Sequence, residues 1–412
     1  MLRNLFFMIF AGLFTLSAQA YSLKETWISA RLHMESVQRA QQGVTQREEQ
    51  KSRAVGALLP SINGFANYTR IDPPSASGFS AFTLTKQYSV GVRLVQPLIR
   101  GGAYSGLQAA KENVLLSQFQ KDAQELDLFQ TVINAYYSLK MVQVDVNNLQ
   151  SFLNLTKDRV SEIRSRTKIG RSRRGELVEA EAQLHAAESQ FQQGQRDLIE
   201  AEKNFEFLTG KKVQDLPELG AIPEVLNDQM NYLNKLKKRP DILALEQQVR
   251  VSHHQVNVSK GGHYPSLDLV GNYYVDRTGI LASSEWDAGI VFSVPFYQGG
   301  TVQAQVREAV ASKRISELTA HESIRTAERQ VSLIYQNHLR LIEQLKSIKE
   351  ARMKSEEAYK LNLKDYQFGL VTNLDVLQSM NSFIQNKRSY DSLFVAGHMS
   401  YQNLEAASGV LP

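Results

Sequence analysis

The two halves of the sequence repeat one order of turn-forming residues. The phrase Pro-x-x-x-Gly-Gly at residues 97–102 recurs at residues 295–300. Three further pairs match in the same order: Pro60 with Pro265, Gly170 with Gly369, and Gly210 with Gly409. Self-similarity at a fixed spacing is the signature of a repeated structural unit. We therefore predict a tandem duplication, with repeat 1 at residues 21–210, an inter-repeat linker at 211–238 and repeat 2 at 239–412.

The first twenty residues have the layout of a secretory signal peptide. One positive charge, Arg3, precedes an apolar stretch from Leu5 to Leu16, and Ala18-Gln19-Ala20 then stands directly before Tyr21. Such a segment is cleaved after the small residues, whereas a buried N-terminal helix, the alternative, has no need of that site. We expect export and a mature chain that begins at Tyr21. The absence of cysteine excludes disulfides and a lipid-anchored cysteine.

Charge and hydropathy exclude two classes of protein. The formal net charge of +5 falls to +4 once Arg3 is removed, which is too small for a strong polyanion-binding field, so we expect no nucleic acid partner. The mature chain has no run of about 18 or more apolar residues, and therefore no transmembrane helix is expected. If the protein spans a membrane, it does so with β-strands.

Two stretches of more than a hundred residues contain no proline, from Leu98 to Leu216 and from Phe296 to Leu411. Because proline breaks helix interiors, its absence permits very long helices, each roughly 100 Å in length at about 1.5 Å per residue. A heptad seam in the second stretch favours helix-on-helix packing. The seam consists of Ile324, Ala327, Val331, Ile334, His338, Leu341, Leu345 and Ile348.

Each repeat also contains two segments in which apolar and polar residues alternate. The fourth segment is the clearest, with Trp286, Ile290 and Phe292 on one side and Asp287 and Ser293 on the other. We predict strands at about 61–70, 88–96, 266–274 and 286–294. We predict helices at about 22–57, 103–168, 173–208, 239–261, 301–367 and 372–407.

The strand lengths and their flanking aromatic residues suit a membrane. Strands of about nine to eleven residues span a bilayer, and tyrosine and tryptophan gather at its interfaces. Four strands cannot close a barrel, and an open sheet edge is not tolerated in hydrocarbon. Three copies would supply twelve strands, an even number within the known range. The connections at 70–87 and 275–285 are predicted as cell-exterior loops.

Three phrases give the chain a family resemblance. The first is the repeated Pro-x-x-x-Gly-Gly, the second is Arg239-Pro240-Asp241-Ile242, and the third runs from Tyr366 to Leu377 as YQFGLVTNLDVL. Together, in order and duplicated, they resemble the outer-membrane efflux protein family over the whole mature chain. The resemblance implies a mixed membrane β-barrel and long α-helical barrel, formed by a homotrimer in the outer membrane that extends into the periplasm. It also implies a periplasmic adaptor and an inner-membrane transporter as partners, in efflux or type I secretion.

The resemblance assigns roles at the two helix-hairpin tips. Tyr366, Asp375 and Glu176 match residues that close the periplasmic entrance in the family, and a ring of carboxylates there would select ions by charge. Val371 stands where relatives have an arginine, so we expect Arg173 or Arg174 to supply the counter-charge. Gln378 replaces a second acid. Solvated charged turns, or turns that only dock an adaptor, are the alternatives. The residues expected to dock the adaptor are Gly170, Gly369, Arg171 and Leu370.

An enzyme is the least favoured class, because the sequence has no nucleotide-binding, hydrolase or metalloprotease motif. His253 and His254 are adjacent on a predicted helix and so point in different directions, which argues against a metal site with His263. We expect His338 to pack between helices. We expect no cofactor. The main alternative to an export channel is a periplasmic coiled-coil adaptor or envelope tether without a membrane barrel.

Overall fold

The computed structural model describes residues 21–72, 86–212, 216–223, 228–279 and 282–412. The predicted signal peptide at 1–20 lies outside these residues. So do most of the first predicted exterior loop, small parts of the linker and two residues of the second loop. None of the helices in the described part of the chain is at once long enough and apolar enough to cross a lipid bilayer.

The chain divides into two compact units that cut across the predicted repeats. Of the described residues, unit 1 comprises those within 21–34, 126–233 and 330–412, and unit 2 comprises those within 35–125 and 234–329. Two long helices contribute to both units, α3 (Ala103–Lys168) and α7 (Thr301–Gln367). Each unit therefore combines segments from both halves of the sequence.

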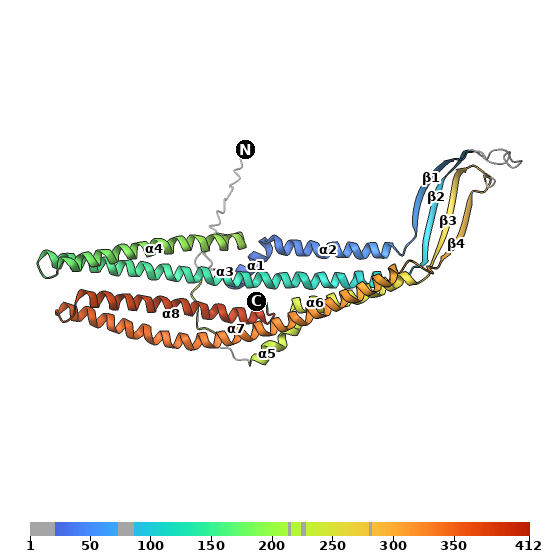
Figure 1. Cartoon of the computed structure of the whole chain (residues 1–412). Helices are drawn as coiled ribbons and strands as arrows, with labels where there is room; N and C mark the ends of the chain where they lie inside the picture. Colours follow the sequence, from blue (N-terminus) through green and yellow to red (C-terminus); the bar gives the residue numbers. More distant parts are fainter. Residues whose placement is uncertain (1–20, 73–85, 213–215, 224–227, 280–281) are drawn as a thin grey trace, which may run out of the picture. The chain divides into compact units, whose positions relative to one another are not determined.

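Unit 1 is built from two helical hairpins (Figure 1). Its other helices are α1 (Leu23–His33), α4 (Arg174–Thr209), α5 (Gln229–Lys235) and α8 (Asn373–Ala407). The first hairpin joins α3 to α4 and the second joins α7 to α8. An apolar cluster from α3, α4 and α8 holds the hairpins together, consisting of Phe152, Leu153, Ala187, Leu377, Met380 and Ile384.

The predicted heptad seam faces the interior where α7 lies in unit 1. Val331 is fully buried, and His338 is 1% exposed. The His338 ring lies 6.2 Å from the Tyr401 ring on α8, and burial lowers the pKa of the imidazole. His338 therefore packs between helices, as its place in the seam predicts.

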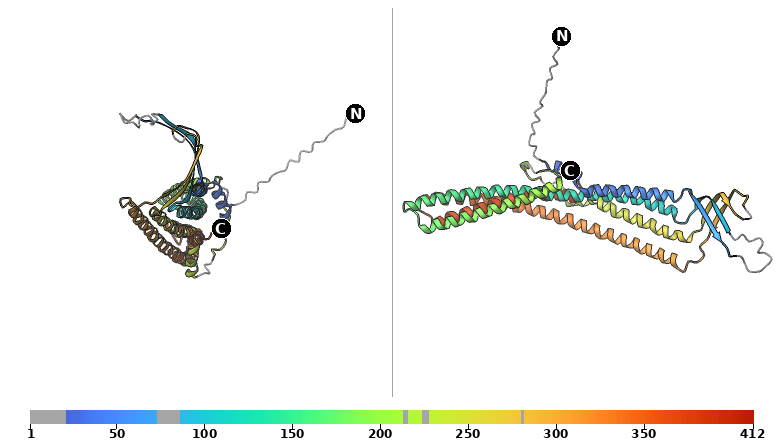
Figure 2. Two further views of the ribbon diagram at one scale, coloured as in Figure 1. Left: turned by 90° about the vertical axis from the view of Figure 1, so that its right-hand side faces the viewer. Right: turned by 90° about the horizontal axis from the view of Figure 1, so that it is seen from above.

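Unit 2 contains one antiparallel sheet and the shorter helices α2 (Glu35–Gly56) and α6 (Pro240–Lys260). The strands are β1 (Ser61–Arg70), β2 (Lys86–Ile99), β3 (Ser266–Arg277) and β4 (Trp286–Ser293), in the order β1-β2-β3-β4. Figure 2 shows them side by side as one long, curved sheet. β1 and β4 form its two edges.

The strand register separates a polar face from an apolar face. A polar row crosses all four strands, because Asn63 pairs with Arg93, Arg93 with Asn272, and Asn272 with Asp287. Arg93 Nε donates to Asn272 Oδ1 at 2.8 Å, and Asn272 Nδ2 donates to Asp287 Oδ1 at 2.7 Å. The next row, on the opposite face, is Gly64, Val92, Tyr273 and Trp286. The alternation read from single strands is thus coherent across the sheet.

The predicted helix at 22–57 is not continuous. α1 ends at His33, Met34 adopts an extended conformation (φ −73°, ψ 124°), and α2 begins at Glu35. The matching site in the second half also has an extended residue, Arg239 (φ −68°, ψ 130°), directly before α6. The break persists in the first half without the proline that marks it in the second.

Two strands extend further than the sequence predicts. β2 continues through Pro97 to Ile99. A register shift between these two residues accommodates the proline, which has no N–H to donate to the neighbouring strand. β3 continues to Arg277, because Asp276 and Arg277 still pair with β2 beyond a bulge. The two predicted loops are correspondingly shorter. Arg70 and Lys86, at the ends of the loop predicted at 70–87, pair with each other as part of the sheet, and β3 takes up the first residues of the loop predicted at 275–285. The predicted linker likewise contains a helix, α5.

Candidate functional site

Each of the two hairpin tips contains a turn, and the two turns have the same backbone conformation. Gly170 and Gly369 both have positive φ, 72° and 73° respectively, the left-handed conformation that glycine adopts at little cost. At the first tip, the N–H groups of Gly170 and Arg171 donate to the carbonyls of Thr167 and Arg166. The corresponding pair of bonds closes the second tip. Both are Schellman turns, which satisfy the last carbonyls of the preceding helix.

The side chains that cap the following helices differ between the tips. At the second tip, Thr372 Oγ1 accepts from the Asp375 N–H at 3.3 Å, and Asp375 Oδ2 accepts from the Thr372 N–H at 2.8 Å. This reciprocal capping box lowers the pKa of Asp375, chiefly through the hydrogen bonds from Thr372. The first tip has no such box, because its N-cap is Arg173, which makes no side-chain bond to the helix. Ser172 instead donates to the Glu176 carboxylate.

Both tips expose apolar side chains. Ile169 is 67% exposed at the first tip, and Phe368 and Leu370 are 70% and 74% exposed at the second. The first tip adds a group of exposed arginines that the second lacks, namely Arg171, Arg173 and Arg174. The tips therefore offer a surface that is apolar at both turns and rich in arginine at the first alone.

Tyr366 lies between the two hairpins rather than on the surface. It is 7% exposed, and its ring is flanked by two guanidinium groups from α3. The Cζ atoms of Arg159 and Arg166 lie 4.0 Å and 4.8 Å from the ring centroid. Cations so close to an aromatic face are attracted by the ring quadrupole. Within one chain, Tyr366 joins the hairpins through its ring.

Glu162 holds both arginines of this cluster on α3. Its carboxylate accepts from Arg159 Nη1 at 2.8 Å and pairs with Arg166 Nη2 at 3.1 Å. Arg159 also reaches α8, because its Nε donates to Asn373 Oδ1 at 3.0 Å. Only 4% of Arg159 and none of Asn373 is exposed to solvent. The cluster therefore links α3, α7 and α8 directly behind the tips.

The sequence analysis does not predict a role for Arg159, Arg166 or Asn373. One sequence signal points to Arg159. Arg159 falls among the buried positions of α3 at heptad spacing, between Thr156 and Ile163. A charged residue in such a seam needs a partner on the facing helix.

The predicted entrance residues all lie at or near the hairpin tips, but they do not all contact one another within one chain. Asp375 and Glu176 each lie in the first turn of a helix, α8 and α4 respectively. Arg173 and Arg174 are exposed. Within one chain, the described residues show no ion pair from either arginine to Glu176 or Asp375.

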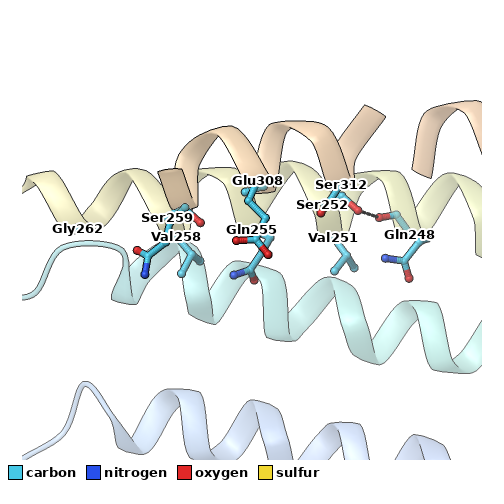
Figure 3. Close-up of a pocket in the computed structure, with 11 residues that line it drawn as sticks. Gln248, Val251, Ser252, Gln255, Val258, Ser259, Gly262, Glu308 and Ser312 are labelled. Atoms are coloured by element: carbon cyan, nitrogen blue, oxygen red, sulfur yellow. Dashed lines mark hydrogen bonds between the residues drawn. The ribbon is translucent and has the colours of Figure 1, made fainter. Parts of the chain in front are cut away.

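A groove between α6 and α7 in unit 2, of about 540 Å³, is a candidate for a small-molecule site (Figure 3). Ser252 Oγ in its wall donates to the Gln248 carbonyl at 2.9 Å and shares a bond with Ser316. Glu308 is the one carboxylate among the residues that line the groove. The described residues contain no group of three or more potential metal ligands. The lining offers hydroxyls and amides without a nucleophile paired to a base.

Comparison with known proteins supports a common fold and family. The model of the family described as outer membrane efflux protein matches residues 29–211 and 232–409. The toluene efflux pump outer membrane protein TtgC of Pseudomonas putida is 20% identical over 349 residues, which cover 81% of this chain and 71% of that protein. The proteases secretion protein PrtF of Dickeya chrysanthemi is 24% identical over 423 residues, which cover 96% of this chain and 89% of that protein. The crystal structure of the outer membrane protein VceC of Vibrio cholerae shares the fold, with a TM-score of 0.84 at 18% identity, covering 94% of this chain and 96% of that one.

Proposed function

The chain belongs to the outer membrane efflux protein family and is an outer-membrane export channel, and we propose that it works as a homotrimer. In this proposal three four-stranded sheets close one twelve-stranded barrel in the membrane. The long helices of the three chains continue from it as a tunnel into the periplasm. The mature chain begins at Tyr21, after removal of the signal peptide.

The open four-stranded sheet is the main observation that supports a trimer. β1 and β4 are unpaired edges, and an open edge cannot face hydrocarbon. The apolar face is broadly exposed in one chain, with Trp286, Ile290 and Phe292 all more than 60% exposed. Edge-to-edge pairing of three copies would cover the edges and turn this face to lipid. The row of Arg93, Asn272 and Asp287 would then line the interior.

The channel is passive and has no cofactor. A periplasmic adaptor and an inner-membrane transporter supply substrate and energy, and these partners set the class of substrate. The names of TtgC and PrtF refer to toluene and to proteases, so relatives serve both small molecules and proteins. The present chain belongs to an efflux system or a type I secretion system of this general kind.

The periplasmic entrance is proposed to lie at the hairpin tips. Threefold symmetry would bring three copies each of Glu176 and Asp375 together, and like charges at close range repel unless they are countered. Arg173 and Arg174 would supply that counter-charge between neighbouring chains. Their exposure supports this role, because each is free to reach outward. Tyr366 contributes by holding the two hairpins of each chain together.

The adaptor is proposed to dock on the same tips, at Gly170, Gly369, Arg171 and Leu370. The matched Schellman turns support this role, since they present two similar surfaces per chain, six in a trimer. The 74% exposure of Leu370 adds an apolar anchor at one of them.

A pair of neighbouring variants in β4 tests the barrel. Ile290→Asp places a charge on the apolar face, and Val291→Asp places the same charge on the polar face beside it. A charged residue on the lipid face of a barrel near the midplane is destabilising, by about 2–4 kcal/mol for arginine or lysine and by less for aspartate, whereas substitutions on the interior face mainly change selectivity. We expect Ile290→Asp to abolish heat-resistant trimers in the outer-membrane fraction, while Val291→Asp retains them. A wild-type protein extracted as a soluble monomer at high salt would contradict the proposal and favour the adaptor or tether.

A further inference from the structure

Four side chains form a continuous stack on the polar face of the sheet in unit 2. Arg93 Cζ lies 5.5 Å from the centroid of the Phe65 ring. Arg277 Cζ lies 4.1 Å from the centroid of the Tyr274 ring. The two rings meet edge to face, with their centroids 5.8 Å apart and an interplanar angle of 85°. Aromatic faces attract cations, and aromatic pairs favour this geometry, so the stack connects β1, β2 and β3 through side chains.

A glycine and a β-bulge make room for this stack. Gly91 pairs with Phe65 on one neighbouring strand and with Tyr274 on the other, so the two rings meet across a residue that has no side chain. Gly91 is buried, and a Cβ atom there would collide with the Tyr273 carbonyl oxygen. The register shift beside Gly91 also turns Arg277 to the face of Tyr274, although the two residues are three apart on β3.

The two carboxylates on the polar face of the described strands each have an arginine partner. Asp287 Oδ2 pairs with Arg277 Nη1 at 3.8 Å, while Asp287 Oδ1 accepts from Asn272. Asp268 Oδ1 pairs with Arg100 Nη2 at 3.4 Å. Opposite charges at such distances offset much of each other's field. These two ion pairs therefore add little net charge to the polar face.

Arg93 differs from the two paired arginines. Its Nε donates to Asn272 Oδ1 at 2.8 Å, and no carboxylate in the described part of the chain lies within salt-bridge distance of its guanidinium group. Arg93 is exposed, whereas only 9% of the Arg277 side chain is exposed. A neutral acceptor fixes the side chain and leaves its charge in place. Each sheet thus presents one ordered guanidinium group whose charge is not offset by a direct ion pair.

We propose that Arg93 is a selectivity residue that favours small anions over cations in the barrel. This inference rests on the proposed function, because three copies of Arg93 form a ring only if three sheets close with their polar faces inward. Rings of fixed side-chain charge select ions by sign. At about 0.1 M salt the field of such a ring extends roughly 10 Å from the wall. The ring opposes the cation preference expected from the entrance carboxylates.

Four variants distinguish a charge effect from a bracing effect. Arg93→Gln removes the charge and keeps a donor for Asn272, whereas Arg93→Lys keeps the charge and loses the planar guanidinium. Asp287→Asn removes the carboxylate that offsets Arg277 and so adds a second uncompensated cation on the same face. Lys86→Gln is the matched control, because it removes one cation from the opposite face of the same strand.

The reversal potential of purified trimers in planar bilayers, under a gradient of potassium chloride, gives the ratio of chloride to potassium permeability. At about 0.1 M salt, Arg93→Gln should lower this ratio about threefold, because three fixed charges are lost from one ring. Arg93→Lys and Lys86→Gln should leave the ratio near that of the wild type, and Asp287→Asn should raise it. At about 1 M salt, where the screening length falls to about 3 Å, the differences should largely disappear.

Heat-resistant trimers in the outer-membrane fraction show that a variant has folded. An unchanged ratio in conducting Arg93→Gln trimers would overturn the inference and leave the channel proposal intact. An equal decrease in Arg93→Gln and Arg93→Lys, or loss of trimers in both, would also overturn it, because Arg93 would then brace the sheet rather than select ions. Wild-type trimers that conduct no ions would contradict the proposed function itself, and the inference with it.

Discussion

The two hairpin tips have the same backbone and different side chains. Both turns close on a left-handed glycine with the same pair of hydrogen bonds. The second tip then starts its helix with the Thr372–Asp375 capping box, whereas the first starts at Arg173 without a side-chain cap. A turn that one residue type dictates can thus be kept in both repeats while its neighbours diverge. The second tip has a side-chain cap on its helix, whereas the first has no such cap and carries exposed arginines instead.

The largest effect is expected from the cluster that joins the second tip to α3. Arg159→Ala removes a buried cation that contacts Tyr366, Glu162 and Asn373, which should destabilise unit 1 by about 3 kcal/mol. Arg173→Ala, at the exposed first tip, should change stability by no more than about 0.5 kcal/mol. Thermal unfolding followed by circular dichroism measures both. Similar Tm values for the two variants would contradict the prediction that the second tip contributes more to the stability of unit 1 than the first.

The shared backbone turn predicts an equal effect at both tips. Gly170→Ala and Gly369→Ala each force a left-handed conformation on a residue with a Cβ, at a cost of about 1–2 kcal/mol. No atom lies within 4 Å of the added Cβ at either position, so sterics with neighbours should not distinguish them. The two Tm shifts should therefore agree. A shift at one tip alone would show that the turns are not equivalent.

A smaller and unequal effect is expected from the caps. Thr372→Ala removes the hydroxyl that caps α8 and should cost about 1 kcal/mol. Ser172→Ala is the matched change at the first tip, where the serine is not the N-cap, and should cost clearly less. Amide hydrogen exchange in the first turns of α8 and α4 reports each cap locally. Equal loss of protection in the two helices would contradict the account.

The smallest effect concerns acid pH at the second tip. The hydrogen bonds from Thr372 hold the pKa of Asp375 below its ordinary value of 3.8. For a carboxyl with a depressed pKa, the stabilisation is present above the ordinary value and is lost as the pH falls through the lower, folded-state value. The α8 cap should therefore persist to about pH 4 and loosen below it, as carboxyl NMR shifts would show. In Asp375→Asn, this acid step should disappear, and cation preference in planar bilayers should weaken as well.

The sequence alone predicts the long helices well because their signals are local. Proline-free stretches and the seam through Val331 and His338 fix both their length and their buried side. The break at Met34 has no such signal, since no proline or glycine marks it. The extension of β2 past Pro97 was missed for the opposite reason, because a register shift tolerates a residue that usually ends a strand.

Only part of the candidate site could be predicted in the same way. Gly170, Gly369 and Asp375 belong to short contiguous motifs that identify a turn or a cap. The Arg159 cluster depends on three helices that meet only in the fold, and no local pattern connects Arg159 with Tyr366 or Asn373. The proposed contacts between charges of neighbouring chains have no local sequence signal, because they depend on the symmetry of an assembly.

The most direct test of an export channel closed at its hairpin tips is the resting conductance of purified trimers in planar bilayers. The account predicts a low wild-type conductance that rises several-fold when both Arg173 and Arg174 are changed to alanine, with the trimer intact. The matched double change of Lys203 and Lys211 to alanine, at exposed positions away from the tips, should leave the conductance low. A wild-type conductance that is already high and insensitive to the tip arginines would contradict closure at the tips. An absence of any channel activity from correctly assembled trimers would contradict the conduit itself.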